Sequence, residues 1–125
     1  MSKNVLIVED DFFNRLLMVT LVEAEGHAVL EATHGREALD ILGHTIPDLI
    51  VMDINMPEMS GTKVLERLKA RPQWANIPVL VVSGYARADE QRSFREAGAD
   101  RIISKPISNV NFIEACSELL AYSNA

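Results

Sequence analysis

Apolar residues in this chain form short continuous runs that alternate with longer stretches of helical periodicity. Continuous apolar runs cover residues 49–52 and 79–82, and a third makes up residues 4–8 apart from Asn4; such runs are typical of strands buried on both faces of a sheet. A weaker run at 27–32 has the character of an edge strand, and a short one lies at 101–104. We therefore expect five strands.

The segments between these runs predict helices at residues 12–25, 35–43, 60–71 and 88–97, and a last helix capped by Ser108. Gly26 is a natural residue to end the first of them, and Ser60 a natural cap to begin the third. On the first helix the pattern predicts that one face, made by Leu17, Met18, Leu21 and Val22, is buried. Leu16 and Val19 lie off that face. Residues 72–78 are expected to form a loop in which Trp74 is a packing anchor.

Strand and helix thus alternate five times with short connections, which favours a parallel sheet with right-handed crossovers. We predict an α/β fold of the doubly wound type, (βα)5, with a five-stranded parallel sheet and helices on both faces. A chain of 125 residues is long enough for one domain with its own core, here residues 1–125.

Composition excludes several classes of protein. Apolar residues make up 48% of the chain, which argues against disorder. The net charge of −6 and the absence of a basic run argue against direct nucleic-acid binding. No apolar run is long enough for membrane insertion, and no signal peptide is present. The single cysteine, Cys116, cannot form an internal disulfide, which favours a reducing, cytoplasmic setting.

Polar residues follow the expected strands where each one ends: Glu9 and Asp10, then Asp53, Ser83 and Lys105. In a parallel sheet these ends share one edge, where α/β proteins bind ligands. Three carboxylates held together repel, and Mg²⁺ with oxygen ligands is the usual remedy. With a metal, a lysine and a hydroxyl around it, Asp53 has the surroundings of a nucleophile in phosphoryl transfer. Alternatively, Asp53 only caps the following turn.

Four motifs at this spacing make the chain closely similar to the receiver domain of two-component response regulators over essentially its full length. They are Val8-Glu9-Asp10-Asp11, Asp53-Ile54-Asn55-Met56-Pro57 with Gly61, Val82-Ser83-Gly84, and Ser104-Lys105-Pro106. The resemblance implies a flavodoxin-like fold and a role in signalling without enzymatic activity beyond the domain's own phosphorylation and dephosphorylation.

The resemblance also assigns roles to residues. Asp53 corresponds to the phosphoacceptor, which takes phosphate from a histidine of a sensor kinase or a phosphotransfer protein. Glu9, Asp10 and Asp53 correspond to the carboxylate ligands of Mg²⁺, and Asn55 to a ligand through its backbone carbonyl. Ser83 and Lys105 correspond to the residues that bind the phosphoryl oxygens, and the Lys105–Pro106 bond is expected to be cis.

Two positions bear on switching and on phosphate lifetime. Ile102 stands where the family usually has an aromatic residue that swings inward on activation. We therefore expect activation to move the loop after Ser83 and the helix that begins at Ala88, with little change at Ile102. In the family, the residues that correspond to Asn55 and Tyr85 flank the path of the attacking water. Tyr85 therefore either shields the acyl phosphate or packs on the surface.

Several functions are compatible with these residues. The leading hypothesis is a complete, single-domain response regulator that binds a downstream protein through helix 88–97, strand 101–104 and the last helix. A phosphorelay intermediate, a phosphate sink and a receiver cut from a hybrid kinase use the same site. A Mg²⁺-dependent phosphohydrolase usually has a second aspartate two residues after its nucleophile, where this chain has Asn55. A nucleotide- or flavin-binding domain is disfavoured because no glycine-rich fingerprint or Walker A loop occurs.

Overall fold

A five-stranded parallel sheet forms the centre of the molecule. The computed structural model describes residues 2–56, 59–84 and 87–122. Within them the strand order is β2-β1-β3-β4-β5, and each neighbouring pair is parallel. The strands are β1 Asn4–Val8, β2 Ala28–Ala32, β3 Leu49–Asp53, β4 Val79–Ser83 and β5 Arg101–Ser104. The predicted α/β fold is confirmed, with the weaker strand β2 at an edge of the sheet.

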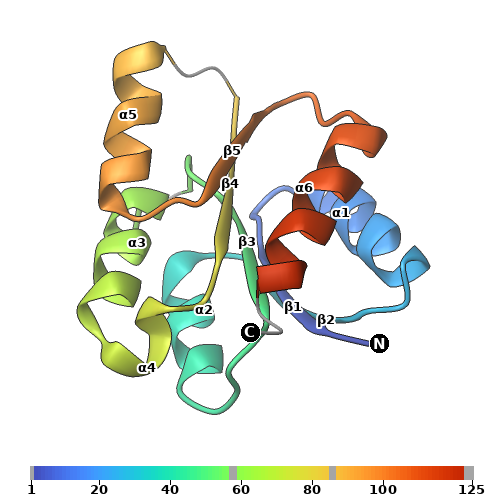
Figure 1. The fold of residues 1–125 in the computed structure, drawn as a ribbon, viewed down its shortest axis with the longest axis horizontal. Helices are drawn as coiled ribbons and strands as arrows, with labels where there is room; N and C mark the ends of the chain where they lie inside the picture. Colours follow the sequence, from blue (N-terminus) through green and yellow to red (C-terminus); the bar gives the residue numbers. More distant parts are fainter. Residues whose placement is uncertain (1, 57–58, 85–86, 123–125) are drawn as a thin grey trace.

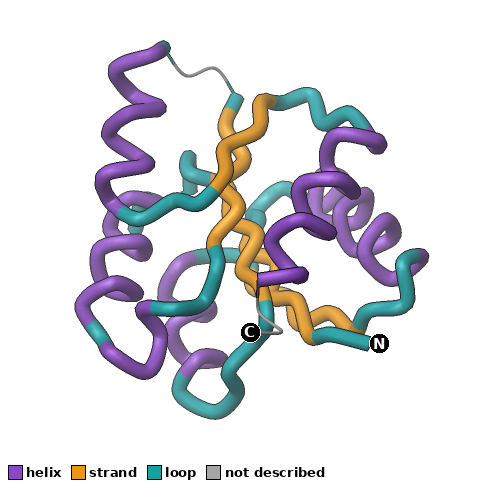
Figure 2. The backbone as a smooth tube through the Cα atoms, in the orientation of Figure 1, coloured by secondary structure: helices purple, strands orange, loops and turns teal. Residues whose placement is uncertain are grey.

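Helices cover both faces of this sheet (Figures 1 and 2). On one face lie α1 (Phe12–Ala24) and α6 (Asn109–Tyr122). The other face carries α2 (Gly35–Leu42), α3 (Gly61–Ala70), the short α4 (Pro72–Ala75) and α5 (Ala88–Ala97). The sheet is therefore enclosed, which is why its central strands are apolar without interruption.

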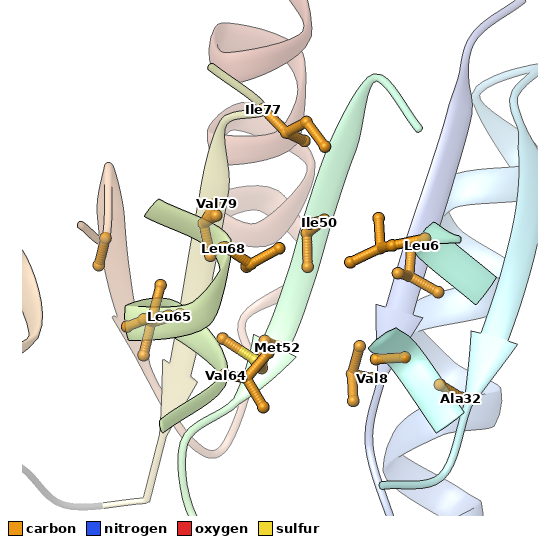
Figure 3. Packing of buried hydrophobic residues seen from close by; sticks show 14 of the residues in the cluster. Leu6, Val8, Ala32, Ile50, Met52, Val64, Leu65, Leu68, Ile77 and Val79 are labelled. Carbon is orange, nitrogen blue, oxygen red and sulfur yellow. The ribbon is translucent and has the colours of Figure 1, made fainter. Parts of the chain in front are cut away.

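Each face of the sheet has its own core because successive side chains of a strand point to opposite faces. In the first core cluster, drawn in Figure 3, strand residues meet Val64, Leu65 and Leu68 of α3. The second cluster joins Val51 and Val82 to Phe112 and other residues of α6. Strands β3 and β4 are buried along their whole length, so their last residues, Asp53 and Ser83, lie where the core meets the edge of the sheet.

The buried face of α1 differs from the predicted one. Met18, Val19 and Val22 are its buried residues, whereas Leu17 is 36% exposed. On a helical wheel Met18, Val19 and Val22 share one arc, and Leu17 lies well outside it. The expectation that Leu17 faces the core and Val19 does not is therefore wrong. Burial is centred on the arc that contacts the sheet and α6, and the apolar residues outside that arc stay on the surface.

Local signals place most of the helix ends. The Ser60 side chain accepts a hydrogen bond from the Lys63 N–H, and Gly26 has a positive φ of 90° after α1, as its predicted role requires. The stretch after α3 was expected to be a loop, but α4 is one short turn of helix that begins at Pro72, a residue suited to the first helical position. Trp74 on that turn is buried in the first core cluster, as predicted.

Helix α5 differs from the others in how it is attached. None of its residues is buried, and it contacts the first core cluster through the partly buried Phe94 and Ala97. Gly98, with φ of 121°, ends the helix and leads into β5. This helix therefore rests on the molecule with little apolar surface between them.

Candidate functional site

The carboxyl ends of four strands bring the predicted site residues to one edge of the sheet. In the register of the strands, Val8 is paired with Met52, Asp53 with Val82, and Ser83 with Ser104. Glu9 and Lys105 each directly follow a strand, so they lie at the same level of the sheet as Asp53 and Ser83. The convergence of side chains that are far apart in the sequence follows from the parallel register.

An acidic cluster lies at this edge. Glu9, Asp10 and Asp53 each have a carboxylate oxygen within 4.8 Å of the others. Glu9 is fully buried and Asp53 is 2% exposed, while Asp10 is exposed. Burial raises the pKa of Glu9 to about 7, and the neighbouring Asp53 adds to the rise. The cluster therefore holds negative charge at a place where water does little to screen it.

Lys105 supplies the positive charge that faces this cluster. Its Nζ lies 3.1 Å from Glu9 Oε1 and 3.1 Å from Asp53 Oδ2. Desolvation acts to lower the pKa of Lys105, but the contacts with Glu9 and Asp53 outweigh it and hold that pKa above its usual value. The backbone places the side chain, because the Lys105 N–H donates to the Ser83 carbonyl at 2.7 Å. The Lys105–Pro106 peptide bond is cis, as the resemblance implied.

Backbone groups hold the Asp53 carboxylate and the loop after it. The Asn55 N–H donates to Asp53 Oδ1 at 3.1 Å, and the Ile54 N–H donates to the Val82 carbonyl at 3.1 Å. Gly61 packs against the same loop so tightly that an added Cβ would lie 2.7 Å from the Ile54 Cα. The sequence marked Gly61 only as part of a motif, whereas the structure shows that this position has no room for a side chain.

Arg15 also supports the site, and sequence reasoning assigned it no part in it. Its Nη1 donates to the backbone carbonyl of Glu9 at 2.9 Å, and its Nε donates to Glu31 Oε1 at 3.1 Å. The guanidinium thereby ties the loop after β1 to the end of β2. The sequence signal that could have identified Arg15 is its spacing from the acidic residues. An arginine one helical turn after Asp11, in the first turns of α1, can reach back over the acidic loop.

The residues present fit a divalent cation. Glu9 Oε1 is buried and accepts no hydrogen bond from the described residues, although the Lys105 ammonium forms an ion pair with it at 3.1 Å. One ammonium offsets only part of the charge of three clustered carboxylates, so a further cation would be stabilising here. Two further carboxylates within 4.8 Å complete a set of hard oxygen donors of the kind that Mg²⁺ prefers. The chemistry of the donor set therefore matches the metal expected from the sequence.

The other predicted positions have these locations. Ser83 is the last residue of β4 and is 2% exposed, and Asn55 is exposed beside Asp53. Ile102 is half-buried in β5 and packs against the first core cluster. Pro57 and Tyr85, which carried part of a motif and the shielding hypothesis, lie outside the described residues. Among the described helices, none is long and apolar enough to cross a membrane.

Comparisons with known proteins agree with this geometry. Residues 5–117 match the response regulator receiver domain family. The polar-differentiation response regulator DivK of Brucella ovis is 41% identical over 120 residues, which span 96% of this chain and 98% of the relative. The DivK protein of Brucella abortus matches with the same identity and coverage.

Solved structures with the same fold include two with more than 30% sequence identity. A receiver domain of a histidine kinase from Syntrophus aciditrophicus has a TM-score of 0.89 and 32% identity, covering 96% of this chain and 91% of that one. A CheY-like receiver protein from Methanospirillum hungatei has a TM-score of 0.89 and 31% identity, covering 99% and 98%.

Proposed function

The chain belongs to the response regulator receiver domain family, and on that premise we propose that it accepts a phosphoryl group on Asp53. The donor is a phosphohistidine of a sensor histidine kinase or a histidine phosphotransfer protein. The phosphorylated form then signals by binding a downstream protein in the cytoplasm. The observation that carries this proposal is the Asp53 carboxylate at the strand end, held between a lysine ammonium and two further carboxylates.

The transfer is a displacement at phosphorus. An oxygen of the Asp53 carboxylate forms the new P–O bond as the P–N bond to the donor imidazole breaks. The electron pair of that bond stays on the imidazole nitrogen, which takes up a proton. No redox step is involved, and the product is an acyl phosphate. The side chain therefore needs to be ionised and correctly oriented, and the Asn55 N–H and Lys105 Nζ both hold it by its oxygens.

Lys105 has a further role once the phosphoryl group arrives. Its ammonium already contacts Asp53 Oδ2, so it lies where charge develops on the equatorial oxygens during transfer. Ser83, at the end of the neighbouring strand, would donate a hydroxyl hydrogen bond to the same group, which its position beside Asp53 supports. We assign both residues to binding of the phosphoryl oxygens.

Glu9, Asp10 and Asp53 would hold Mg²⁺ through carboxylate oxygens, together with the backbone carbonyl of Asn55. When bound, the metal supplies positive charge that offsets the charge of the incoming phosphoryl group. The Glu9 carboxylate oxygen without a hydrogen bond supports this assignment. Arg15 fixes the backbone of Glu9 and so keeps the donor set in place.

The test is labelling by a small-molecule phosphodonor and by a phosphorylated histidine kinase. We expect the intact mass to increase by one phosphoryl group in Mg²⁺ and not in EDTA. The label should be lost at alkaline pH, as an acyl phosphate is, and Asp53→Asn should take none. Asp48→Asn, at the opposite end of β3, is the matched control and should be labelled like the wild type.

Labelling of Asp53→Asn at the wild-type rate, or labelling that is unaffected by EDTA, would overturn the proposal. Multiple turnover of a phosphomonoester would instead indicate the phosphohydrolase alternative. Transfer of the label onward to a second histidine protein would identify the chain as a relay intermediate.

The surface that carries the signal is proposed to be α5, β5 and α6. Helix α5 follows the loop after Ser83, and β5 leads directly into Lys105, so two of the three elements connect to the residues that we assign to phosphoryl binding. A pull-down with and without a phosphate mimic would identify a partner for this surface.

A further inference from the structure

A groove between α2 and α3 lies outside the phosphoryl-acceptor site. Its volume is about 840 Å³, and Trp74 of α4 is one of its lining residues. Figure 1 shows these three helices gathered on the same side of the sheet. Sites for organic ligands commonly measure about 300–1,000 Å³, so this groove is of a size for a small molecule rather than for a lone ion. None of its lining residues belongs to the acidic cluster.

Positive charge is concentrated along this groove. Arg36 approaches from α2, while Arg67 and Arg71 approach from the end of α3. His44 lines the same groove, and Asp40 is its one acidic lining residue. In the part of the chain that the structure describes, none of the three arginines takes part in an ion pair. The chain as a whole has a net charge of −6, so a basic groove differs in sign from the average surface. Such a groove favours an anionic ligand.

The placement of the arginines favours a phosphate. Arg67 lies in the last turn of α3, and Arg71 is the residue that ends this helix with an extended backbone, so both like charges line the same end of the groove and repel each other. The Arg71 guanidinium lies over the Trp74 ring, 4.8 Å from its centroid, which holds its planar donors in one orientation. Guanidinium groups with fixed orientation match the oxygens of a phosphate through paired hydrogen bonds. An anion between them would also relieve the repulsion.

Apolar surface lies beside this charge. Leu39 and Met59 line the groove and are only half-buried, and Trp74 forms part of its wall. A smaller hollow of about 120 Å³ shares Arg36 and Met59 with the groove and extends it along α2. A ligand that fits this groove should therefore combine a planar or apolar ring, which contacts the apolar lining residues, with a phosphate, which binds the arginines.

We propose that the α2–α3 groove binds a nucleoside phosphate, with the phosphate held by Arg36, Arg67 and Arg71 and the base against Leu39 and Met59. The binding does not require a phosphoryl group on Asp53, and the proposal does not rest on the function proposed above. It gives the protein a second input, through a small molecule, on a face that the phosphoryl site does not use.

The chain contains one tryptophan, Trp74, so its fluorescence reports directly on the groove. We would titrate the protein in EDTA with each of the four ribonucleoside monophosphates, and with ribose nucleosides and inorganic phosphate alone. Amide chemical shifts in NMR spectra provide a second readout that does not depend on light absorption by the base. We expect at least one nucleotide to saturate with Kd below about 1 mM, with the shifts confined to α2, α3 and α4.

Variants make the test specific. Arg36→Gln and Arg67→Gln should each weaken binding by at least about tenfold, because each removes a charge-assisted hydrogen bond. Both residues are exposed and form no ion pair with the residues that the structure describes, so the variants should fold. Arg92→Gln, on the exposed surface of α5, is the matched control and should bind like the wild type. Arg67→Gln should still accept phosphate at Asp53 at the wild-type rate.

Three results would overturn the proposal. No nucleotide binds below 1 mM in either readout; inorganic phosphate binds as tightly as the nucleotides; or Arg36→Gln and Arg67→Gln bind as the wild type does. The second result would reduce the groove to a general anion site without a place for the base.

Discussion

Replacement of Lys105 by methionine tests whether one ammonium holds the acidic site together when no metal is bound. Lys105 Nζ lies 3.1 Å from an oxygen of Glu9 and 3.1 Å from an oxygen of Asp53, and both carboxylates are almost fully buried. Methionine keeps much of the side-chain length and removes the charge. The folded protein then carries the clustered carboxylates without the positive charge of the lysine, and, among the described residues, only backbone N–H groups still donate to them.

The expected loss can be worked out from these distances. At an effective dielectric constant of about 20, each pair at this separation attracts by about 5 kcal/mol, and the cost of desolvating the charges offsets most of that. Removal of one partner from a buried pair costs about 3–5 kcal/mol. The Lys105 side chain is 23% exposed and the carboxylates can take up a proton, so the lower end applies. We expect a loss of about 3 kcal/mol in the free energy of unfolding.

The assay is urea unfolding at pH 8 in EDTA, followed by circular dichroism. Lys63→Met is the matched control, since Lys63 is exposed on α3 and forms no ion pair within the described ranges; it should change the unfolding free energy by less than about 0.5 kcal/mol. Addition of Mg²⁺ should then raise the stability of Lys105→Met by more than that of the wild type, because only the variant lacks a resident cation.

A double variant isolates the interaction. Once Glu9 is also replaced by glutamine, the loss caused by Lys105→Met should shrink, since one of the two unpaired carboxylates is gone. If Lys105→Met is as stable as the wild type in EDTA, or if its loss is the same with Glu9→Gln, the ammonium does not stabilise the acidic cluster and the reasoning is wrong.

Further predictions concern three other positions, Gly61, Cys116 and Ile102. Gly61→Ala should destabilise the protein by about 1–3 kcal/mol in thermal or urea unfolding, because its Cβ would lie 2.7 Å from Ile54 Cα. Gly84→Ala should not, because the described part of the chain places no atom within 4 Å of the added Cβ; equal effects would contradict the packing. Burial raises the pKa of the Cys116 thiol to about 12, so labelling by iodoacetamide at pH 8 should occur only as fast as the protein unfolds, and rapid labelling in native buffer would contradict this. Above pH 9 the thiol of the unfolded chain, with its ordinary pKa of 9.0, loses its proton, whereas the folded thiol keeps it. Deprotonation therefore favours the unfolded state, and Cys116 should lower the free energy of unfolding as the pH rises above 9. On binding of a phosphate mimic, the Ile102 methyl resonances should shift less than the amides that follow Ser83, and a rotamer change at Ile102 would refute the expected mode of activation.

The sequence predicted the strands and the acidic site well because both depend on simple physical constraints. A strand buried on both faces has to be apolar throughout, so Asp53 and Ser83 could be recognised as the points where burial ends. A parallel sheet then brings its strand ends to one edge regardless of their separation in the chain. The contacts of Lys105 with Glu9 and Asp53 follow from that rule, although the roles of these residues in phosphoryl transfer stay predictions.

Features that depend on three-dimensional packing were not visible in the sequence. The buried arc of α1 is set by the elements that lie against it, so the pattern alone misplaced Leu17 and Val19. The tight approach of Gly61 to Ile54 depends on the path of a loop. The arginines of the α2–α3 groove come from two helices, and only the one-turn spacing of Arg67 and Arg71 could have drawn attention to them.

Helix α5 buries none of its own side chains, and this has a consequence for how the molecule distributes its rigidity. Separation of the helix from its neighbours would bring little apolar surface into contact with water, so its detachment or tilting is cheap compared with unfolding of the sheet. Because α5 is the next element along the chain after β4, a structural change at the end of β4 reaches this helix first. Motion can therefore be confined to a single peripheral segment while the hydrophobic layers on both faces of the sheet keep their packing.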